Sequence, residues 1–155
     1  MARTLLDNEQ WDFGTNCFVC EPKNERGIGI PFYLDAEAES VVTDFTPELH
    51  HSGAPAIAHG GFSMALLDEG MAWAVIAIAH RFGLSRKIEV EFERPVKVGR
   101  DDSRVDRDLV ATGEILDDRG KVCVSARGSF YEMTKEEAAA AIGAESEQAA
   151  TYTER

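Results

Sequence analysis

The alternation of hydrophobic and polar positions predicts a β-rich chain. Five segments carry the β-forming side chains, or the period-two alternation, that are typical of strands. They span residues 28–34, 40–45, 88–93, 109–116 and 121–133. The last two segments are joined by Asp117-Asp118-Arg119-Gly120, where a glycine suits a hairpin turn. Hairpin-like connections of this kind indicate an antiparallel sheet.

One long helix is predicted between the second and third of these strands. Within residues 62–79 the only charged side chains are Asp68 and Glu69. We expect a helix that starts at the preceding glycine pair, runs to about Arg81 and is stopped by Gly83. A helix that is apolar nearly all round is normally buried. A carboxylate there costs several kcal/mol unless it is paired or hydrogen-bonded, which indicates a functional use.

The chain is expected to form one domain, because its 155 residues are 44% hydrophobic, enough for one core without disulfides. Strands outnumber helices, which predicts an α+β fold with an antiparallel sheet wrapped around one long buried helix. We assign residues 1–15 to an N-terminal arm or short helix and residues 16–133 to the main domain. Residues 134–155 are predicted to form a C-terminal helix and tail, opened by a capping box that starts at Thr134.

The net charge limits the classes of partner, and the N-terminal residues bear on the compartment. A net charge of −12 argues against nucleic acid or an anionic membrane as a partner. The first residues are too polar for a signal peptide, and no apolar run approaches the roughly 18–20 residues of a membrane span. We therefore expect a cytoplasmic protein.

The cysteines give no clear site. Their number, three, does not suggest a disulfide framework. Cys17 and Cys20 form a C-x-x-C motif, but no second pair is present to complete a zinc site, so we interpret them as small buried hydrophobic residues. The sequence also carries no dinucleotide fingerprint, P-loop or G-x-S-x-G nucleophile elbow. Neither a metal nor a cofactor is expected.

Three motifs occur in order along the chain. They are NCFVCEPKNERGIGI at residues 16–30, HGGFSMALLDE at residues 59–69 and VEFERPVKVG at residues 90–99. Their order and spacing resemble the hot-dog-fold acyl-CoA thioesterases of the phenylacetate-pathway and thioesterase-superfamily-member type. The resemblance covers residues 16–131. It implies a hot-dog fold, hydrolysis of an acyl-CoA thioester to free acid and CoA, and a homodimer or tetramer with the substrate between subunits.

The resemblance assigns catalytic roles within the second motif. It implies that the Gly60 N–H, at the helix N-terminus, donates to the thioester oxygen as negative charge develops there. Asp68 corresponds to the catalytic carboxylate, which acts either as a general base on water or as a nucleophile. His59 orients the loop. Glu69 lies about 100° round the helix from Asp68, so we expect it to be structural or at the subunit interface.

Substrate binding is implied for His51, Gly61, Ser85 and Arg94. The better-studied branch of the family has an asparagine six residues before the motif histidine, where this chain has Gly53. The role of that asparagine is left unassigned, with His51 and Ser52 as substitutes. Ser85 matches a position that often carries a hydroxyl near the attacking water. Coenzyme A is a polyanion and the chain is itself negatively charged, so binding requires local positive charge. Arg94 is one of several cations near the third motif that are candidates to supply it.

Two alternatives stay open at this point. One is a non-catalytic acyl-CoA-binding or lipid-binding hot-dog protein, which saturable binding without turnover would identify. The other is a hot-dog hydratase, but such relatives place a histidine a few residues after the aspartate, whereas His80 comes twelve residues after Asp68. The acyl group remains open, from aryl to long-chain, and so does a carrier-protein thioester as the substrate.

Overall fold

The computed structural model describes residues 3–8, 16–99, 103–108 and 112–132. The predicted C-terminal helix and tail lie outside this part of the chain, as does most of the predicted N-terminal arm. Within the described residues, no helix is long and apolar enough to cross a membrane.

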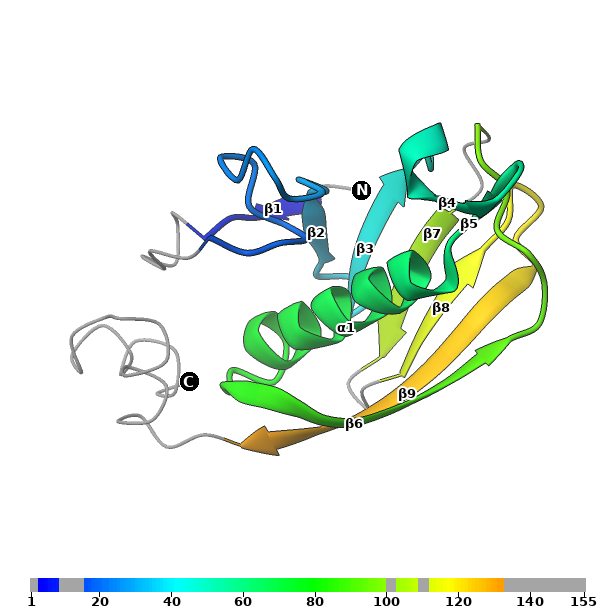
Figure 1. Ribbon diagram of the computed structural model, residues 1–155. Coiled ribbons are helices and arrows are strands. Elements are labelled where there is room, and N and C mark those ends of the chain that lie inside the picture. Colours follow the sequence, from blue (N-terminus) through cyan, green and yellow to red (C-terminus); the bar gives the residue numbers. More distant parts are fainter. Residues whose placement is uncertain (1–2, 9–15, 100–102, 109–111, 133–155) are drawn as a thin grey trace.

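Seven strands of the described residues form one antiparallel sheet in the order β1-β2-β3-β7-β8-β9-β6 (Figure 1). Their bounds are β1 Thr4–Leu6, β2 Phe32–Asp35, β3 Ser40–Phe45, β6 Gly83–Phe92, β7 Ser103–Asp108, β8 Thr112–Leu116 and β9 Val122–Glu132. The strand that follows the helix, β6, lies at one edge of the sheet and pairs with β9 along nearly its whole length. The other edge is β1.

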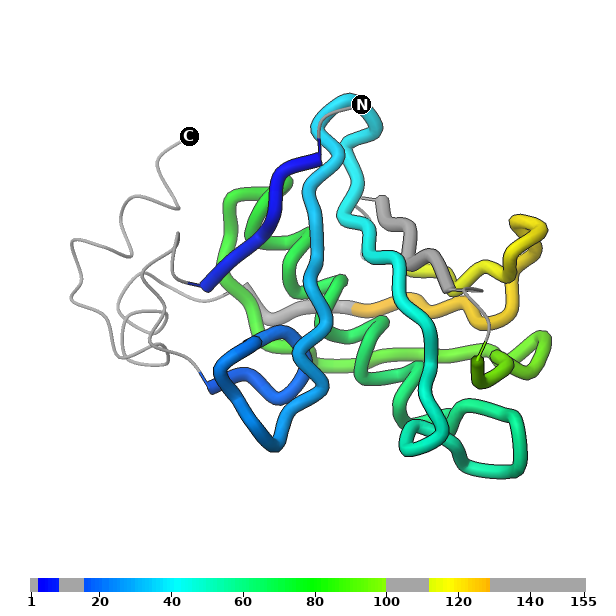
Figure 2. Tube along the Cα trace, turned by 90° about the horizontal axis from the view of Figure 1, so that it is seen from above, coloured from blue at the N-terminus to red at the C-terminus, as the bar shows by residue number. Residues whose placement is uncertain are grey.

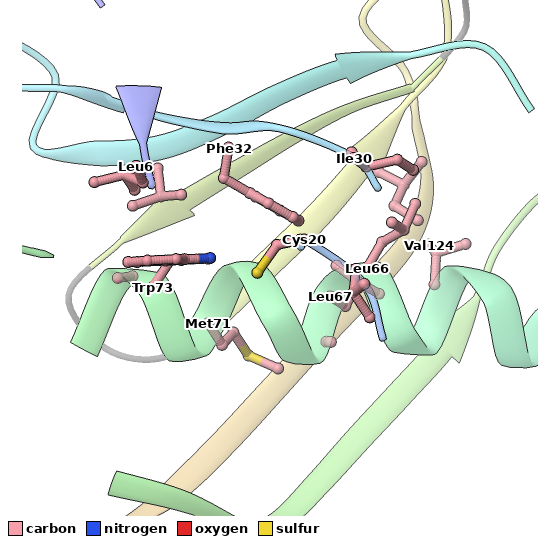
Figure 3. Close-up of a cluster of buried hydrophobic side chains, with 14 of the residues drawn as sticks. Leu6, Cys20, Ile30, Phe32, Leu66, Leu67, Met71, Trp73 and Val124 are labelled. Carbon is pink, nitrogen blue, oxygen red and sulfur yellow. The ribbon is translucent and has the colours of Figure 1, made fainter. Parts of the chain in front are cut away.

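The helix α1, Gly60–Ala77, lies across one face of this sheet (Figure 1). Its side chains Leu66, Leu67 and Met71 are fully buried and belong to the same cluster as Phe32 of β2 (Figure 3). Burying each such side chain contributes roughly 1.5–3 kcal/mol to stability. The predicted α+β arrangement, an antiparallel sheet around one long buried helix, is confirmed.

The end of the helix differs from the prediction. α1 ends at Ala77, four residues before the predicted end at about Arg81. The cause is local, because His80 takes a φ of 52°, which a right-handed helix does not accommodate. Gly83, which was expected to stop the helix, is instead the first residue of β6.

The predicted strands are found, with shifted bounds. β3 matches its predicted range, whereas the strand predicted at residues 28–34 is β2, which begins only at Phe32. Gly29 has a φ of 68° and residues 28–30 belong to a loop, since the Ile28 N–H donates to the Phe18 carbonyl at 2.7 Å. The hairpin turn before β9 is as predicted, with Gly120 at a φ of 71°.

Two strands of the seven-stranded sheet were not predicted. β7 has the sequence SRVDRD, and it is a strand because it pairs with β3 on one side and β8 on the other. β1 replaces the short helix that was one alternative for the N-terminus, and it extends the sheet beyond β2.

The segment before the helix folds into a small unit of its own. The predicted loop at residues 50–56 contains the 3-10 turn η1, Leu49–His51, and the strand β4, Ser52–Ala54, which pairs with β5, Ile57–Ala58. The His59 N–H donates to the His51 carbonyl at 2.8 Å. This unit therefore holds His51 beside the start of α1.

Candidate active site at the helix N-terminus

His59 is the N-cap of α1. Its backbone is extended, with a φ of −63° and a ψ of 135°, and its Nδ1 accepts a hydrogen bond from the Gly61 N–H at 2.9 Å. Its carbonyl accepts from the Phe62 N–H at 2.9 Å. None of the described residues accepts a hydrogen bond from the Gly60 N–H. The first turn of the helix thus offers one backbone donor to a ligand, and it is the predicted one.

Close packing explains the glycine at position 53. A Cβ at Gly53 would lie 3.0 Å from the Cα of His59 and 2.9 Å from its Cδ2. An asparagine of the kind found in the better-studied branch of the family therefore does not fit this loop without a backbone shift. Whether His51 or Ser52 takes the role of that asparagine stays a prediction.

His51 is held by its neighbours on three sides. Its Nδ1 accepts from the Glu48 N–H at 2.9 Å, and its ring stacks on Phe62 with the centroids 4.2 Å apart. Burial lowers the pKa of His51, and the charge of His50 lowers it further. A neutral imidazole that accepts at Nδ1 carries its proton on Nε2, so His51 has one N–H left to donate.

Two clefts flank the start of α1. The larger has a volume of about 480 Å³, and its walls include Phe18, Arg26, His51, His59, Gly61 and Phe62. The smaller has a volume of about 300 Å³, and its walls include Gly60, Ser63, Phe92, Arg94 and Val96. The structure therefore brings His51, His59 and Gly61 together on one side, and Gly60 with Arg94 on the other.

Asp68 lies away from both clefts. It stands eight residues after Gly60, which is about 12 Å along the helix axis. Its Oδ1 is buried and has no hydrogen-bond partner among the described residues. Residues four apart share a helix face, so Gly60, Met64 and Asp68 form one stripe, and Met64 on that stripe is 42% exposed.

Ser85 is not brought to the helix N-terminus within one subunit. It is exposed on β6, seven residues before Phe92, whose ring packs beside Gly60. Seven residues of strand span roughly 23 Å. Within one subunit Ser85 and Gly60 therefore lie far apart, as Asp68 and Gly60 do.

The surroundings of Glu69 were not predicted from the sequence. Its carboxylate meets the thiols of Cys17 and Cys20, which come from the loop of residues 16–30. Burial raises the pKa of Glu69 to about 7, and the charge of Cys17 adds to the effect. The available signal was an acid on an apolar helix together with a C-x-x-C motif, but nothing in their spacing predicts contact.

Comparisons with known proteins agree with this architecture. Residues 56–101 match the family model described as the thioesterase superfamily. A solved structure of a thioesterase superfamily protein is similar with a TM-score of 0.68 and 23% identity, over 84% of this chain and 67% of that chain. This chain has the hot-dog fold of the thioesterase superfamily. The predicted hot-dog fold is thereby confirmed, and the predicted resemblance to thioesterases is found over the matched residues 56–101.

Two further solved structures are similar to this hot-dog chain. A hypothetical thioesterase protein with coenzyme A from Streptococcus pneumoniae has a TM-score of 0.50 and 16% identity, over 61% of this chain and 78% of that one. The E. coli PaaI protein from the phenylacetic acid degradation operon has a TM-score of 0.50 and 19% identity, over 62% and 74% of the two chains. None of the curated proteins matches this chain in sequence.

Proposed function

We propose that this hot-dog protein hydrolyses acyl-CoA thioesters, with Asp68 as the catalytic carboxylate and the Gly60 N–H as the oxyanion donor. The superfamily match supports a thioester substrate, and the similar protein from S. pneumoniae was solved with coenzyme A. The observation that carries the assignment to Asp68 is its buried Oδ1, which has no partner among the described residues. Leaving such an acceptor unsatisfied costs on the order of 1–3 kcal/mol, which favours a use in substrate or water binding.

One subunit does not contain a complete site. Gly60 and Asp68 are about 12 Å apart along α1, too far to act on the same carbonyl. The edge strand β6 has exposed apolar side chains at Leu84 and Phe92, which are 60% and 52% exposed, and Met64 is exposed beside Asp68 on the helix. An unpaired edge with apolar side chains favours pairing with a second copy. We infer a homodimer in which Asp68 of one subunit meets Gly60 of the other.

The reaction then follows from the two groups. Asp68 takes a proton from a water molecule as the water oxygen attacks the thioester carbon, or the carboxylate attacks that carbon itself. The carbonyl oxygen becomes negative and accepts from the Gly60 N–H, where the helix dipole adds to the stabilisation. The carbon–sulfur bond breaks, and the CoA thiolate leaves and takes up a proton. Water supplies the second oxygen of the free acid.

Other residues hold the substrate. His59 keeps the first turn in place through its bond from the Gly61 N–H, and His51 has an Nε2–H to offer in the larger cleft. Arg94 shares the smaller cleft with Gly60 and supplies positive charge for the CoA phosphates. Ser85 comes from the same subunit as Asp68 and is the candidate for holding the attacking water.

The test is the release of free thiol from a panel of acyl-CoA thioesters, aryl to long-chain, by the parent and by Asp68→Asn. We expect turnover by the parent and a loss of about 10²–10⁴-fold in the isosteric variant, the usual contribution of a general base. The preferred member of the panel identifies the acyl class. Binding of acyl-CoA without turnover by the parent would contradict the proposal and favour the non-catalytic alternative.

A further inference from the structure

A second cluster of reactive groups lies about 100° round α1 from the stripe of Asp68. The thiol sulfurs of Cys17 and Cys20 and a carboxylate oxygen of Glu69 all lie within 4.8 Å of one another. The cysteines belong to the loop of residues 16–30, which lies beside α1 when the molecule is seen from above (Figure 2). Figure 3 shows the sulfur of Cys20 pointing toward the helix. The proposed hydrolysis uses none of these three groups.

Several N–H groups donate hydrogen bonds to the sulfur atoms of the two cysteines. The backbone N–H groups of Val19 and Cys20 both donate to the Sγ of Cys17, each at 3.3 Å. A side-chain N–H of Asn8 donates to the Sγ of Cys20 at 3.5 Å. Donors that point at a sulfur favour its thiolate form, which is the form that binds metal. The Ile30 N–H, which donates to the Val19 carbonyl at 2.9 Å, fixes the turn to the chain before β2.

We propose that Cys17, Cys20 and Glu69 bind one Zn²⁺ ion, with water as the fourth ligand. Thiolate with carboxylate is a ligand set that zinc accepts, and tetrahedral zinc with Zn–S distances of about 2.3 Å places its two sulfurs about 3.8 Å apart. The three ligand atoms are already within 4.8 Å, so only a small adjustment is required. A disulfide between the two cysteines would leave the buried carboxylate of Glu69 without a partner, whereas zinc engages all three groups.

The ion would tie the loop of residues 16–30 to α1 one residue after Asp68. Phe18, between the two cysteines, lines the larger cleft together with Ala65, which lies one turn before Glu69 on the same helix face. Zinc would therefore fix one wall of that cleft relative to the other. Binding would displace the protons that the ligands hold, so the affinity is expected to rise with pH.

The experiment is a titration of the reduced, metal-free full-length protein with Co²⁺, followed by displacement with Zn²⁺. Thiolate ligands give cobalt a sulfur-to-metal charge-transfer band in the near ultraviolet, and tetrahedral coordination gives intense visible bands. We expect both at one equivalent, and their disappearance when one equivalent of Zn²⁺ is added. The charge-transfer band is expected to be lost in Cys17→Ser and Cys20→Ser, and Glu69→Gln is expected to weaken Zn²⁺ binding by about tenfold or more.

The chain offers a matched control in its third cysteine. Cys123 is buried on β9, outside the cluster, so Cys123→Ser is expected to keep the full cobalt spectrum. The absence of a charge-transfer band in the reduced parent protein would overturn the proposal, and this outcome does not depend on how any variant folds. Equal Zn²⁺ affinity of Glu69→Gln and the parent, with both folded by circular dichroism, would overturn the role of Glu69. Loss of the band in Cys123→Ser as complete as in Cys17→Ser would overturn the assignment of the site.

Discussion

Asp68 and Glu69 are neighbours in sequence on the one buried helix, yet they have different surroundings. Asp68 shares a stripe with Gly60 and Met64, and one of its carboxylate oxygens is buried with no partner among the described residues. Glu69 lies about 100° away on the stripe of Ala65 and faces two thiols. One step along a helix therefore separates a carboxylate with an unpartnered buried oxygen from one that faces two thiols.

This difference shows how burial changes the pKa of an acid. Burial is the largest cause that raises the pKa of Glu69 to about 7, and the neighbouring acids raise it further. We therefore expect Glu69 to hold its proton up to about pH 7 in the metal-free protein, whereas the proposed partners of Asp68 are the substrate and a second subunit. The following changes test this contrast, from the largest expected effect to the smallest.

Gly60→Pro is expected to lower kcat/KM for thioester hydrolysis by about 10²–10³-fold, because proline lacks the N–H that serves as oxyanion donor. Proline suits the first residue of a helix, and His59 already has the extended backbone that a following proline requires. Gly60→Ala is the matched control. It adds a Cβ 3.2 Å from the Cζ of Phe92, as proline does, but it keeps the donor. Equal losses in the two variants, measured by thiol release, would show that the N–H is not used.

Glu69→Gln is expected to stabilise the metal-free protein at high pH. The folded-state pKa of Glu69 is raised from 4.5 to about 7, so folding holds this proton and the free energy of unfolding falls as pH rises between these values. Glutamine cannot ionise, and its advantage over the parent should grow from near zero at pH 4.5 to about 3 kcal/mol at pH 8. Denaturant unfolding with a chelator present measures it. A glutamine variant less stable than the parent at pH 8 would contradict this environment for Glu69.

Mixed dimers test whether the site is shared between subunits. Gly60→Pro and Asp68→Asn are each expected to be nearly inactive alone. If they are refolded together, half of the dimers are mixed and each mixed dimer has one intact site, so about a quarter of the parent activity should return. Activity no greater than the sum of the two separate variants would place Gly60 and Asp68 in the same subunit's site, or in none.

His59→Ala is expected to have the smallest effect, a loss of about 1 kcal/mol in the free energy of unfolding, because the Gly61 N–H loses its side-chain acceptor. His59→Asn keeps a good N-cap and should recover most of that loss. Thermal unfolding of the two variants beside the parent measures the difference. If asparagine is as destabilising as alanine, the capping bond is not what His59 contributes.

The local patterns predicted the elements that carry their own signal. The apolar run of residues 62–79 predicted α1, and the cost of a carboxylate on a buried helix drew attention to Asp68 and Glu69. The choice of Asp68 between them came from the family resemblance. The turn at Gly120 was likewise predicted from its own residues. β7 was missed, since the sequence SRVDRD carries little β-forming signal, and it is the backbone pairing with β3 and β8 that identifies the strand.

The parts of the site that depend on distant contacts were not predictable in the same way. Gly53 stood out only as a departure from the family pattern, and its packing against His59 gives the reason. Cys17 and Cys20 were interpreted as buried hydrophobic residues, because the third group of their cluster is about fifty positions away in sequence and only the fold brings it near. Ser85 and Asp68 could be placed relative to Gly60 only once the length of α1 and the direction of β6 were known.

The most direct measurement is kcat/KM for thiol release from the best acyl-CoA substrate by Asp68→Asn and Glu69→Gln, side by side with the parent and with a chelator present. We expect Asp68→Asn to lose about 10²–10⁴-fold, the contribution of a catalytic carboxylate. Glu69→Gln should stay within about tenfold of the parent, because its carboxylate faces away from the thioester. A parent-like rate for Asp68→Asn, or equal losses in the two variants, would contradict the division of roles between these neighbouring acids.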